Sequence, residues 1–331
     1  MAKAFALLRA GYPYLTTYGM RRVTTFASDI AFGDEGRTYV VSRGEYGPNI
    51  RKLNHEDEDL GTIDGPFTWP TCVVRDRAEN LYVSDEGAHT VSAFSRQGEP
   101  LRKFGELGTG PGQLNRPSGL AFDGDENLYV SDTQNHRIQK FTNEGEFIAG
   151  WGVHGSEPGQ LDMPWGVTVD GDGDVYVADW RNDRIQKFDS EGRFIMSLGH
   201  SGTANGEFNR PSGIAVDEHG DIIVADRGNN RVQLFDHRGR YVEKFMGDAT
   251  ISRMGRVYVL ANHKTLRLRE MTELEPQKLF RAPTSVRLGP NGDLYVCDQA
   301  SHRVQVYRKE AYVLAEDQIL PEMKAPTLMT T

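Results

Sequence analysis

The chain has 331 residues, of which 38% are hydrophobic and 26% are charged, and its formal net charge is −9. This acidic balance argues against a protein that mainly contacts nucleic acid or an anionic membrane. No apolar stretch is long enough to span a bilayer, so no membrane association is expected. The two cysteines, Cys72 and Cys297, are too few for a disulfide framework and favour a reduced, cytoplasmic setting.

The N-terminal segment, residues 1–26, resembles a signal peptide only faintly. Its apolar run AFALL has five residues before Arg9 interrupts it, and no clear cleavage site follows. We therefore interpret this segment as an edge strand that helps to close a ring of sheets.

A tandem repeat dominates the rest of the chain. Two markers recur at a constant interval of 47 residues, a proline and an aspartate that ends a short apolar run such as LYVSD or VYVAD. The positions are Pro70, Pro117, Pro164 and Pro211 for the proline, and Asp85, Asp132, Asp179 and Asp226 for the aspartate. Apolar alternation of period two and Gly/Asn/Asp turns predict four antiparallel strands per repeat. Repeats of this length are typical of the four-stranded blades of a β-propeller.

Weaker copies set the expected number of blades. One copy precedes Pro70, a shortened copy covers residues 248–282, and a last copy begins at Pro283. Counting the YV-type runs gives seven, so we predict an all-β, closed propeller of seven blades in a single domain, residues 1–331. The expected blades are residues 27–69, 70–116, 117–163, 164–210, 211–247, 248–282 and 283–331. Six blades is the alternative if the short copy forms no sheet.

One rim of the ring is expected to carry the variable chemistry. The long linkers between repeats, such as GELGTGPGQLNRP, and the loops after each aspartate emerge at the same end of the sheets. A repeated Asp/Arg pair, such as Asp132 with Arg137, is predicted to bridge the second and third strands across this loop. We interpret the pair as structural because it recurs once per blade. DGDGD at residues 170–174 lacks the Gly and Glu of a calcium loop and is predicted to be a hairpin turn.

Candidate binding residues gather at this rim. The position after each repeat proline should line the mouth of the central channel, and it holds Thr71 and Trp165 among small polar residues. Trp180 in the same repeat as Trp165 suggests an aromatic wall or a contact for a partner. Basic side chains around them could hold a carboxylate or phosphate: Arg43, Arg181, Arg227, His89, His136, His263 and Lys264. Cys72 could act as a thiol near His89, although a buried packing role fits it better.

The strings VSDTQNHRIQKF, VADWRNDRIQKF and VADRGNNRVQLF, each followed by a Gly turn, resemble NHL repeats. NHL propellers include protein-binding modules, RNA-binding modules and a zinc-dependent lyase. The chain also distantly resembles that lyase family, which cleaves peptidyl-hydroxyglycine. Ser42-Arg43-Gly44 and the DEGAHTV string with His89 match its patterns, so Arg43 and His89 are candidate catalytic residues. The positions where that family places histidine after the proline hold other residues here: Thr71, Trp165 or Ser212, and Thr284.

We therefore predict no zinc site of that family and assign no metal ligands or cofactor, with zinc and calcium left open. The main hypothesis is a propeller that binds a protein partner or a small anionic ligand at the linker-bearing rim. Its expected ligand-binding residues are Arg43, Thr71, His89, Trp165, Trp180, Arg181, Arg227 and His263. The alternative is a lyase or hydrolase with a rebuilt site. Nucleic acid is disfavoured as a partner, and the oligomeric state stays open.

Overall fold

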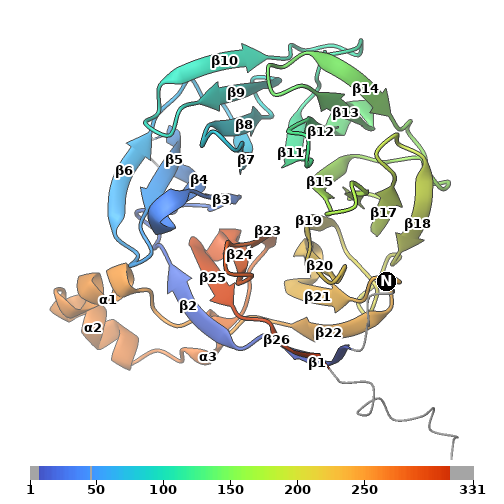
Figure 1. The fold of residues 1–331 in the computed structure, drawn as a ribbon. Helices are drawn as coiled ribbons and strands as arrows, with labels where there is room; N and C mark the ends of the chain where they lie inside the picture. Colours follow the sequence, from blue (N-terminus) through green and yellow to red (C-terminus); the bar gives the residue numbers. More distant parts are fainter. Residues whose placement is uncertain (1–6, 45–46, 314–331) are drawn as a thin grey trace, which may run out of the picture.

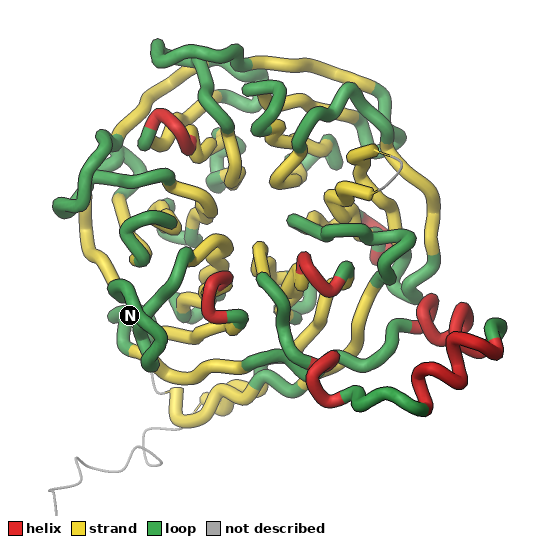
Figure 2. Tube along the Cα trace, turned by 180° about the vertical axis from the view of Figure 1, so that it is seen from behind, coloured by secondary structure: helices red, strands yellow, loops and turns green. Residues whose placement is uncertain are grey.

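Six four-stranded antiparallel sheets surround a common axis in the computed structural model, which describes residues 7–44 and 47–313 (Figure 1). The prediction of seven blades is therefore wrong, and the six-bladed alternative is the one observed. Within each sheet the first strand lies nearest the axis. Figure 2 shows the same ring from the opposite side.

The strands of the first three blades, from the axis outward, are β3 (Ile30–Phe32), β4 (Thr38–Gly44), β5 (Gly47–Leu53), β6 (Asp59–Ile63); β7 (Pro70–Arg75), β8 (Leu81–Asp85), β9 (Thr90–Phe94), β10 (Pro100–Phe104); and β11 (Pro117–Phe122), β12 (Leu128–Asp132), β13 (Arg137–Phe141), β14 (Phe147–Trp151). Those of blades 4 and 5 are β15 (Pro164–Val169), β16 (Val175–Asp179), β17 (Arg184–Phe188), β18 (Phe194–Leu198); and β19 (Pro211–Val216), β20 (Ile222–Asp226), β21 (Arg231–Phe235), β22 (Tyr241–Phe245).

The two ends of the chain share the sixth blade. Its inner strands are β23 (Pro283–Leu288), β24 (Leu294–Asp298) and β25 (Arg303–Tyr307), and its outermost strand is β2 (Tyr14–Tyr18). Because β2 comes from the N-terminal segment, its pairing with β25 closes the ring. A further pair, β1 (Leu7–Gly11) with β26 (Glu310–Val313), adds a small separate sheet. In the described part of the chain no helix is long and apolar enough to span a membrane.

The segment predicted to be the short blade is a helical insertion outside the ring (Figure 1). It contains α1 (Arg253–Leu260), α2 (His263–Glu270) and α3 (Glu275–Lys278). The run VYVL, which looks like a strand, lies in α1, and the Ser252 side chain caps this helix by accepting a hydrogen bond from the Gly255 amide. Asn262, which separates VYVL from the following TLRLRE, is the N-cap of α2 and not part of a hairpin turn.

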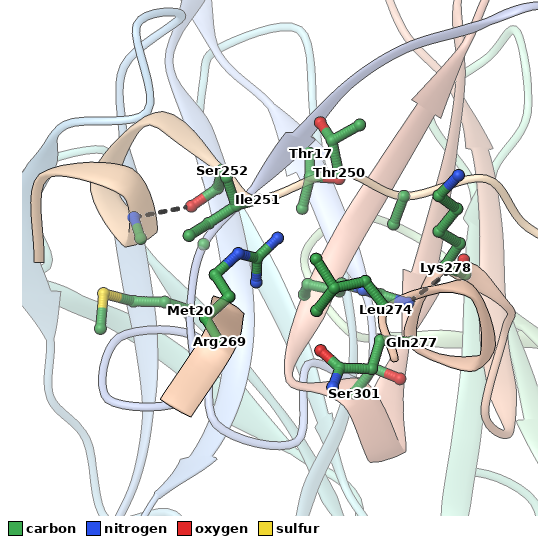
Figure 3. Close-up of a pocket in the computed structure, with 14 residues that line it drawn as sticks. Thr17, Met20, Thr250, Ile251, Ser252, Arg269, Leu274, Gln277, Lys278 and Ser301 are labelled. Carbon is green, nitrogen blue, oxygen red and sulfur yellow. Dashed lines mark hydrogen bonds between the residues drawn. The ribbon is translucent and has the colours of Figure 1, made fainter. Parts of the chain in front are cut away.

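The insertion lies against β2 and encloses a pocket of about 230 Å³. Figure 3 shows Arg269 and Leu274 of the insertion among the side chains that line this pocket, together with Thr17 and Met20. The apolar faces of the helices are only partly covered, since Val257 is 65% and Leu268 is 66% exposed.

Packing between neighbouring sheets forms the core. Tyr129 of blade 3, which is fully buried, packs with Val167 and Val177 of blade 4, and similar clusters fill the other interfaces. The alternation of apolar residues in each strand places one set of side chains toward each neighbouring blade. Each blade therefore buries both of its faces, which explains why the second strands are mostly apolar up to their terminal aspartate.

The repeated Asp/Arg pair forms a buried network, and its predicted structural role is confirmed. The carboxylate of Asp132 accepts hydrogen bonds from the Asn115 amide (2.6 Å), Arg137 Nε (2.7 Å) and Gln139 Nε2 (3.0 Å). The Arg137 guanidinium also donates to backbone carbonyls of the linker that precedes the blade. Equivalent bonds are made by Asp179 with Arg184 and by Asp226 with Arg231. The pair thus fixes the linkers of the rim as well as two strands.

Candidate functional site

One position of the repeat lies near the mouth of the channel in every blade, and its side chain varies from blade to blade. It is the residue directly after the repeated aspartate, or after Ser42 in blade 1. From blade 1 to blade 6 these residues are Arg43, Glu86, Thr133, Trp180, Arg227 and Gln299. Because the aspartate ends the second strand at the linker-bearing rim, the next residue lies at that rim near the axis. The blade scaffold is regular here, and the chemistry varies.

Arg43 lies at the side of the mouth formed by blades 1 and 2. Its Nε donates to the Pro70 carbonyl at 2.8 Å and its Nη2 donates to Thr71 Oγ1 at 3.3 Å. The guanidinium carbon is 4.5 Å from the centre of the Trp69 ring, which gives a cation–π contact. Burial lowers the pKa of Arg43 to about 10; Glu86 raises it and Arg227 lowers it further.

Glu86 is the acidic residue whose charge acts most strongly on the pKa of Arg43. Burial raises the pKa of its carboxyl, against the charge of Arg43 and a hydrogen bond of 3.1 Å from Thr71 Oγ1. Glu86 also raises the pKa of Arg227, the arginine of blade 5. One half-buried carboxylate therefore faces two arginines, and the positive charge of the mouth is only partly balanced.

Arg227 is held by a single side-chain contact. Its Nη2 donates to Gln299 Oε1 at 3.3 Å, whereas its Nε is buried without a hydrogen-bond partner in the described structure. Burial, followed by the nearby charge of Arg210, lowers the pKa of Arg227. An unpartnered buried N–H of a charged group is costly, and an anionic acceptor would relieve that cost.

Three tryptophans border these charges. Trp165 and Trp180 lie with their ring centres 5.8 Å apart, and the Arg210 guanidinium lies 5.0 Å from the centre of the Trp180 ring. Trp69 is 50% exposed, although Arg43 covers part of it. The mouth thus combines arginine and tryptophan, the residue types enriched at the centres of protein interfaces.

The channel is narrow below the mouth, and a larger cavity adjoins Arg43. Asp29 and Arg287 form a buried ion pair of 2.7 Å inside the ring, where the remaining cavity is about 30 Å³. Beside Arg43, between blades 1 and 6, lies a cavity of about 600 Å³ that is also lined by Arg21, Arg22 and Arg51. Among the described residues that line it, none is acidic. Farther along the axis, the inner strands line another cavity of about 440 Å³, with Phe32, Val74 and Phe122 among its lining residues. On the side of the mouth, the larger space for a ligand is the cavity beside Arg43.

Four of the residues proposed from sequence are in contact in two pairs, Arg43 with Thr71 and Trp165 with Trp180. A fifth, Arg227, is close enough for its charge to lower the pKa of Arg43. Thr71 is buried, and its hydroxyl joins Arg43 to Glu86.

The other proposed residues have different settings. His89 is half-buried, and its Nδ1 accepts a hydrogen bond from the Arg116 amide at 3.1 Å. Arg181 is exposed, and its charge acts on His136. His263 begins α2 of the insertion outside the ring, so the assumption that it belongs to a blade rim is wrong.

Cys72, considered as a thiol nucleophile, is buried beside Arg287. Burial raises the pKa of its thiol well above the usual value, which disfavours the thiolate.

Sequence reasoning missed Glu86, Trp69, Arg210 and Gln299. From sequence, the residue after each repeat proline was expected at the mouth. The hydroxyl groups of these serines and threonines mostly link neighbouring inner strands instead; Ser118, for example, donates to the Trp165 carbonyl at 2.9 Å. The signal that could have found Glu86 and Gln299 is the position one residue after the repeated aspartate. Trp69 and Arg210 precede a repeat proline, where the chain turns into the first strand.

Comparisons with known proteins agree with this architecture. The NHL repeat matches residues 114–141, 161–188, 208–235 and 280–307. No curated protein sequence matches the chain closely enough to count as a relative.

Solved structures of similar fold share little sequence with the chain. A protein of unknown function from Bacteroides thetaiotaomicron has a TM-score of 0.63 and 18% identity, over 91% of this chain and 72% of that one. Virginiamycin B lyase from Staphylococcus aureus has a TM-score of 0.58 and 12% identity, over 93% and 90%. A chain of a nidogen/laminin complex has a TM-score of 0.54 and 18% identity, over 66% and 79%. At identities this low, the similarity shows a shared fold and nothing about function. The chain carries NHL repeats and folds as a six-bladed β-propeller.

Proposed function

We propose that the mouth of the propeller binds an acidic segment of a protein partner, with a carboxylate placed between Arg43 and Arg227. The observation that carries this proposal is the incomplete pairing of the two arginines. Burial lowers the pKa of both, and Arg227 Nε has no acceptor in the described structure. A carboxylate would supply acceptors and charge at once.

The surroundings favour a protein segment as the ligand. Trp69, Trp165 and Trp180 offer large apolar surfaces next to the charges, as in the centres of many protein interfaces. The neighbouring cavity of about 600 Å³ adds Arg21 and Arg22, together with Arg51, which already pairs with Asp59 at 3.1 Å. The cavity therefore has room and charge for a second acidic side chain. The nidogen/laminin complex, in which a chain of similar fold occurs, is consistent with such a role.

The alternative, a lyase or hydrolase with a rebuilt site, has less support. Its two candidate catalytic residues are Arg43 and His89, and Nδ1 of His89 is engaged by the Arg116 amide. The arginine is at the mouth, but no recorded contact among the described residues joins it to His89.

The proposal can be tested by titrating the protein with a hexaglutamate peptide and with a hexaglutamine peptide, using calorimetry and tryptophan fluorescence. We expect binding of the acidic peptide only. Replacing Arg227→Gln, or Trp180→Leu, should weaken binding about tenfold, or about 1.4 kcal/mol. Arg240→Gln is the matched control, because Arg240 lies in a turn at the opposite rim and its side chain is 70% exposed.

Three outcomes would count against the proposal. Equal binding of the two peptides would exclude recognition of carboxylates. Unchanged affinity in both mouth variants would place the site elsewhere. Glutarate binding as tightly as the peptide, and competing with it, would identify a small dicarboxylate as the ligand instead of a protein segment.

A further inference from the structure

Three side chains with metal-ligating atoms meet where the rim joins blades 3 and 4. His136 ends the loop between β12 and β13, and His154 and Asp162 lie in the linker between β14 and β15. Their ligand atoms all lie within 4.8 Å of one another. Asp162 Oδ1 is 3.2 Å from His136 Nδ1 and 3.6 Å from His154 Nε2, and the two imidazole rings are 4.4 Å apart between centres.

The fold repeats this junction, but the ligand-type residues are not repeated. One repeat earlier the equivalent positions hold His89, Leu107 and Asn115, and one repeat later they hold Asp183, Ser201 and Asn209. The backbone geometry is the same in all three, since the Arg116, Met163 and Arg210 amides donate to the side chains of His89, His136 and Asp183 respectively. Thus the scaffold does not require His154 or Asp162, and of these three junctions one has ligand-type residues at all three positions.

His136, His154 and Asp162 face one another, and in the described structure no positive charge lies between them. His136 Nδ1 accepts the Met163 amide hydrogen at 3.1 Å, so this nitrogen carries a lone pair and cannot donate to Asp162. Oδ1 of Asp162 is buried and has no hydrogen-bond partner in the described structure. Two lone-pair atoms therefore face each other at 3.2 Å, an arrangement that a bound cation would stabilise.

The two histidines differ in how freely they can move. His136 is half-buried and held at the end of its loop, where it accepts the Met163 amide hydrogen. His154 is exposed, with 67% of its side chain accessible, so its ring can adjust to an ion without disturbing the core.

We propose that His136, His154 and Asp162 bind one divalent transition-metal ion, of which zinc is the best-suited class. Two imidazoles and one carboxylate form a ligand set that zinc accepts, with water completing the coordination. The ion takes the Nδ1 lone pair of His136 from the Met163 amide, so that one hydrogen bond is exchanged for a metal bond. This site lies at a blade junction of the rim and is independent of the proposed carboxylate site.

Binding would connect the metal to the mouth through the backbone. The Asp162 carbonyl accepts the Arg181 amide hydrogen at 3.1 Å, and Arg181 follows Trp180 in the same loop. The ion would thus fix the linker to the loop of blade 3 and steady the loop that carries the tryptophan.

The test is calorimetric titration of chelator-treated protein, produced without a histidine tag, with zinc chloride and separately with magnesium chloride. We expect zinc to bind at one ion per chain and magnesium to bind far more weakly. His154→Leu and Asp162→Asn introduce residues that sister repeats already carry, so both variants should fold. Each should weaken zinc binding by about tenfold or more, because one of three protein ligands is lost.

His200→Ala is the matched control, since His200 is an exposed histidine in the next linker, near Glu207, and its loss should leave zinc affinity unchanged. A cobalt titration provides a spectroscopic check, because visible absorption bands should appear in the wild type and be lost in His154→Leu. The proposal is overturned if the wild type binds no zinc at micromolar concentrations, or if both ligand variants bind it as tightly as the wild type.

Discussion

Blades 3 to 5 and the mouth use arginine in opposite ways. In blade 5, Arg231 is 3% exposed, yet its guanidinium contacts the Asp226 carboxylate at 2.6 Å and three linker carbonyls. At the mouth, Arg43 and Arg227 share the influence of one carboxylate, Glu86. A fully paired buried charge supports the fold, whereas a half-buried and poorly paired one is available to a ligand.

Blade 2 shows how the repeat departs from its pattern without losing its aspartate. Asp85 has no arginine partner, because Thr90 stands at the arginine position, and its carboxylate instead accepts the backbone amides of residues 68, 69, 87 and 88. The aspartate thus remains a loop anchor when the arginine is lost. Blades 1 and 2 thus depart from the repeat, and Arg43, Glu86 and Trp69 lie at their side of the mouth.

The largest effect is expected from Asp226→Asn, which removes the charge that balances Arg231. Breaking one side of such a buried pair should lower the free energy of unfolding by about 3–5 kcal/mol. Urea unfolding followed by circular dichroism measures it. Asp189→Asn is the control: this carboxylate pairs with the exposed Arg193 on the surface, and the midpoint should hardly move. Equal losses in the two variants would remove the distinction between network and surface pairs.

A much smaller loss is expected from Arg43→Gln. The substitution removes a desolvated charge together with its contacts to Trp69 and Pro70, so the opposing effects should leave a change of about 1 kcal/mol or less. The same urea titration applies. If Arg43→Gln destabilised the protein as strongly as Asp226→Asn, Arg43 would be a structural arginine like Arg231, and the proposed carboxylate site would lose its main residue.

The pH dependence of anion binding tests the role of Glu86. Burial raises the pKa of this carboxyl, so the folded protein takes up a proton above the pH at which a free glutamate would. As the pH falls through that raised pKa, Glu86 becomes neutral and stops competing for Arg43 and Arg227. Sulfate, which stays ionised, should then bind a few-fold more tightly at pH 5 than at pH 7.5, as measured by calorimetry.

Glu86→Gln is the diagnostic variant for this effect. It should bind sulfate more tightly at pH 7.5 and show little further gain at pH 5. A wild-type affinity that does not change between the two pH values would contradict the assignment of Glu86 as the competing group. Asp85 and Arg116, which also act on the pKa of Glu86, are unchanged in this variant.

The smallest effect is expected in the helical insertion. Leu268 is 66% exposed on α2, so Leu268→Gln should change the free energy of unfolding by no more than about 0.5 kcal/mol. Leu234→Ala, at a fully buried position of blade 5, should cost about 2–5 kcal/mol under the same conditions. A large loss in Leu268→Gln would show that the insertion is part of the cooperative core after all.

Much of the fold could be predicted because short segments of each repeat already indicate their own secondary structure. Period-two alternation, turn residues and the proline and aspartate markers indicate strands, hairpins and rim without reference to distant contacts. The Asp/Arg bridge could also be predicted, since its partners are five residues apart and recur in several blades. Arg43, Trp180 and Arg227 could be proposed from sequence because the position that they share varies between repeats, and their role in binding stays a prediction.

The errors have a common origin in features that the repeat does not specify. VYVL reads as a strand in isolation, but it pairs with no sheet of the ring and lies in a helix capped by Ser252. The Thr71 hydroxyl and the charge of Glu86 connect Arg43 of blade 1 with blade 2, so local sequence does not reveal this interaction.

The sequence by itself determined a ring of antiparallel blades with a variable rim, because strand periodicity and turn chemistry act over a few residues. The tertiary structure decided the number of blades, since β2 pairs with β25 and the sixth sheet is complete without the insertion. It also decided which charges meet at the mouth. Closing the ring brings one residue from each blade toward a common axis, and only there do Arg43, Glu86 and Arg227 influence one another.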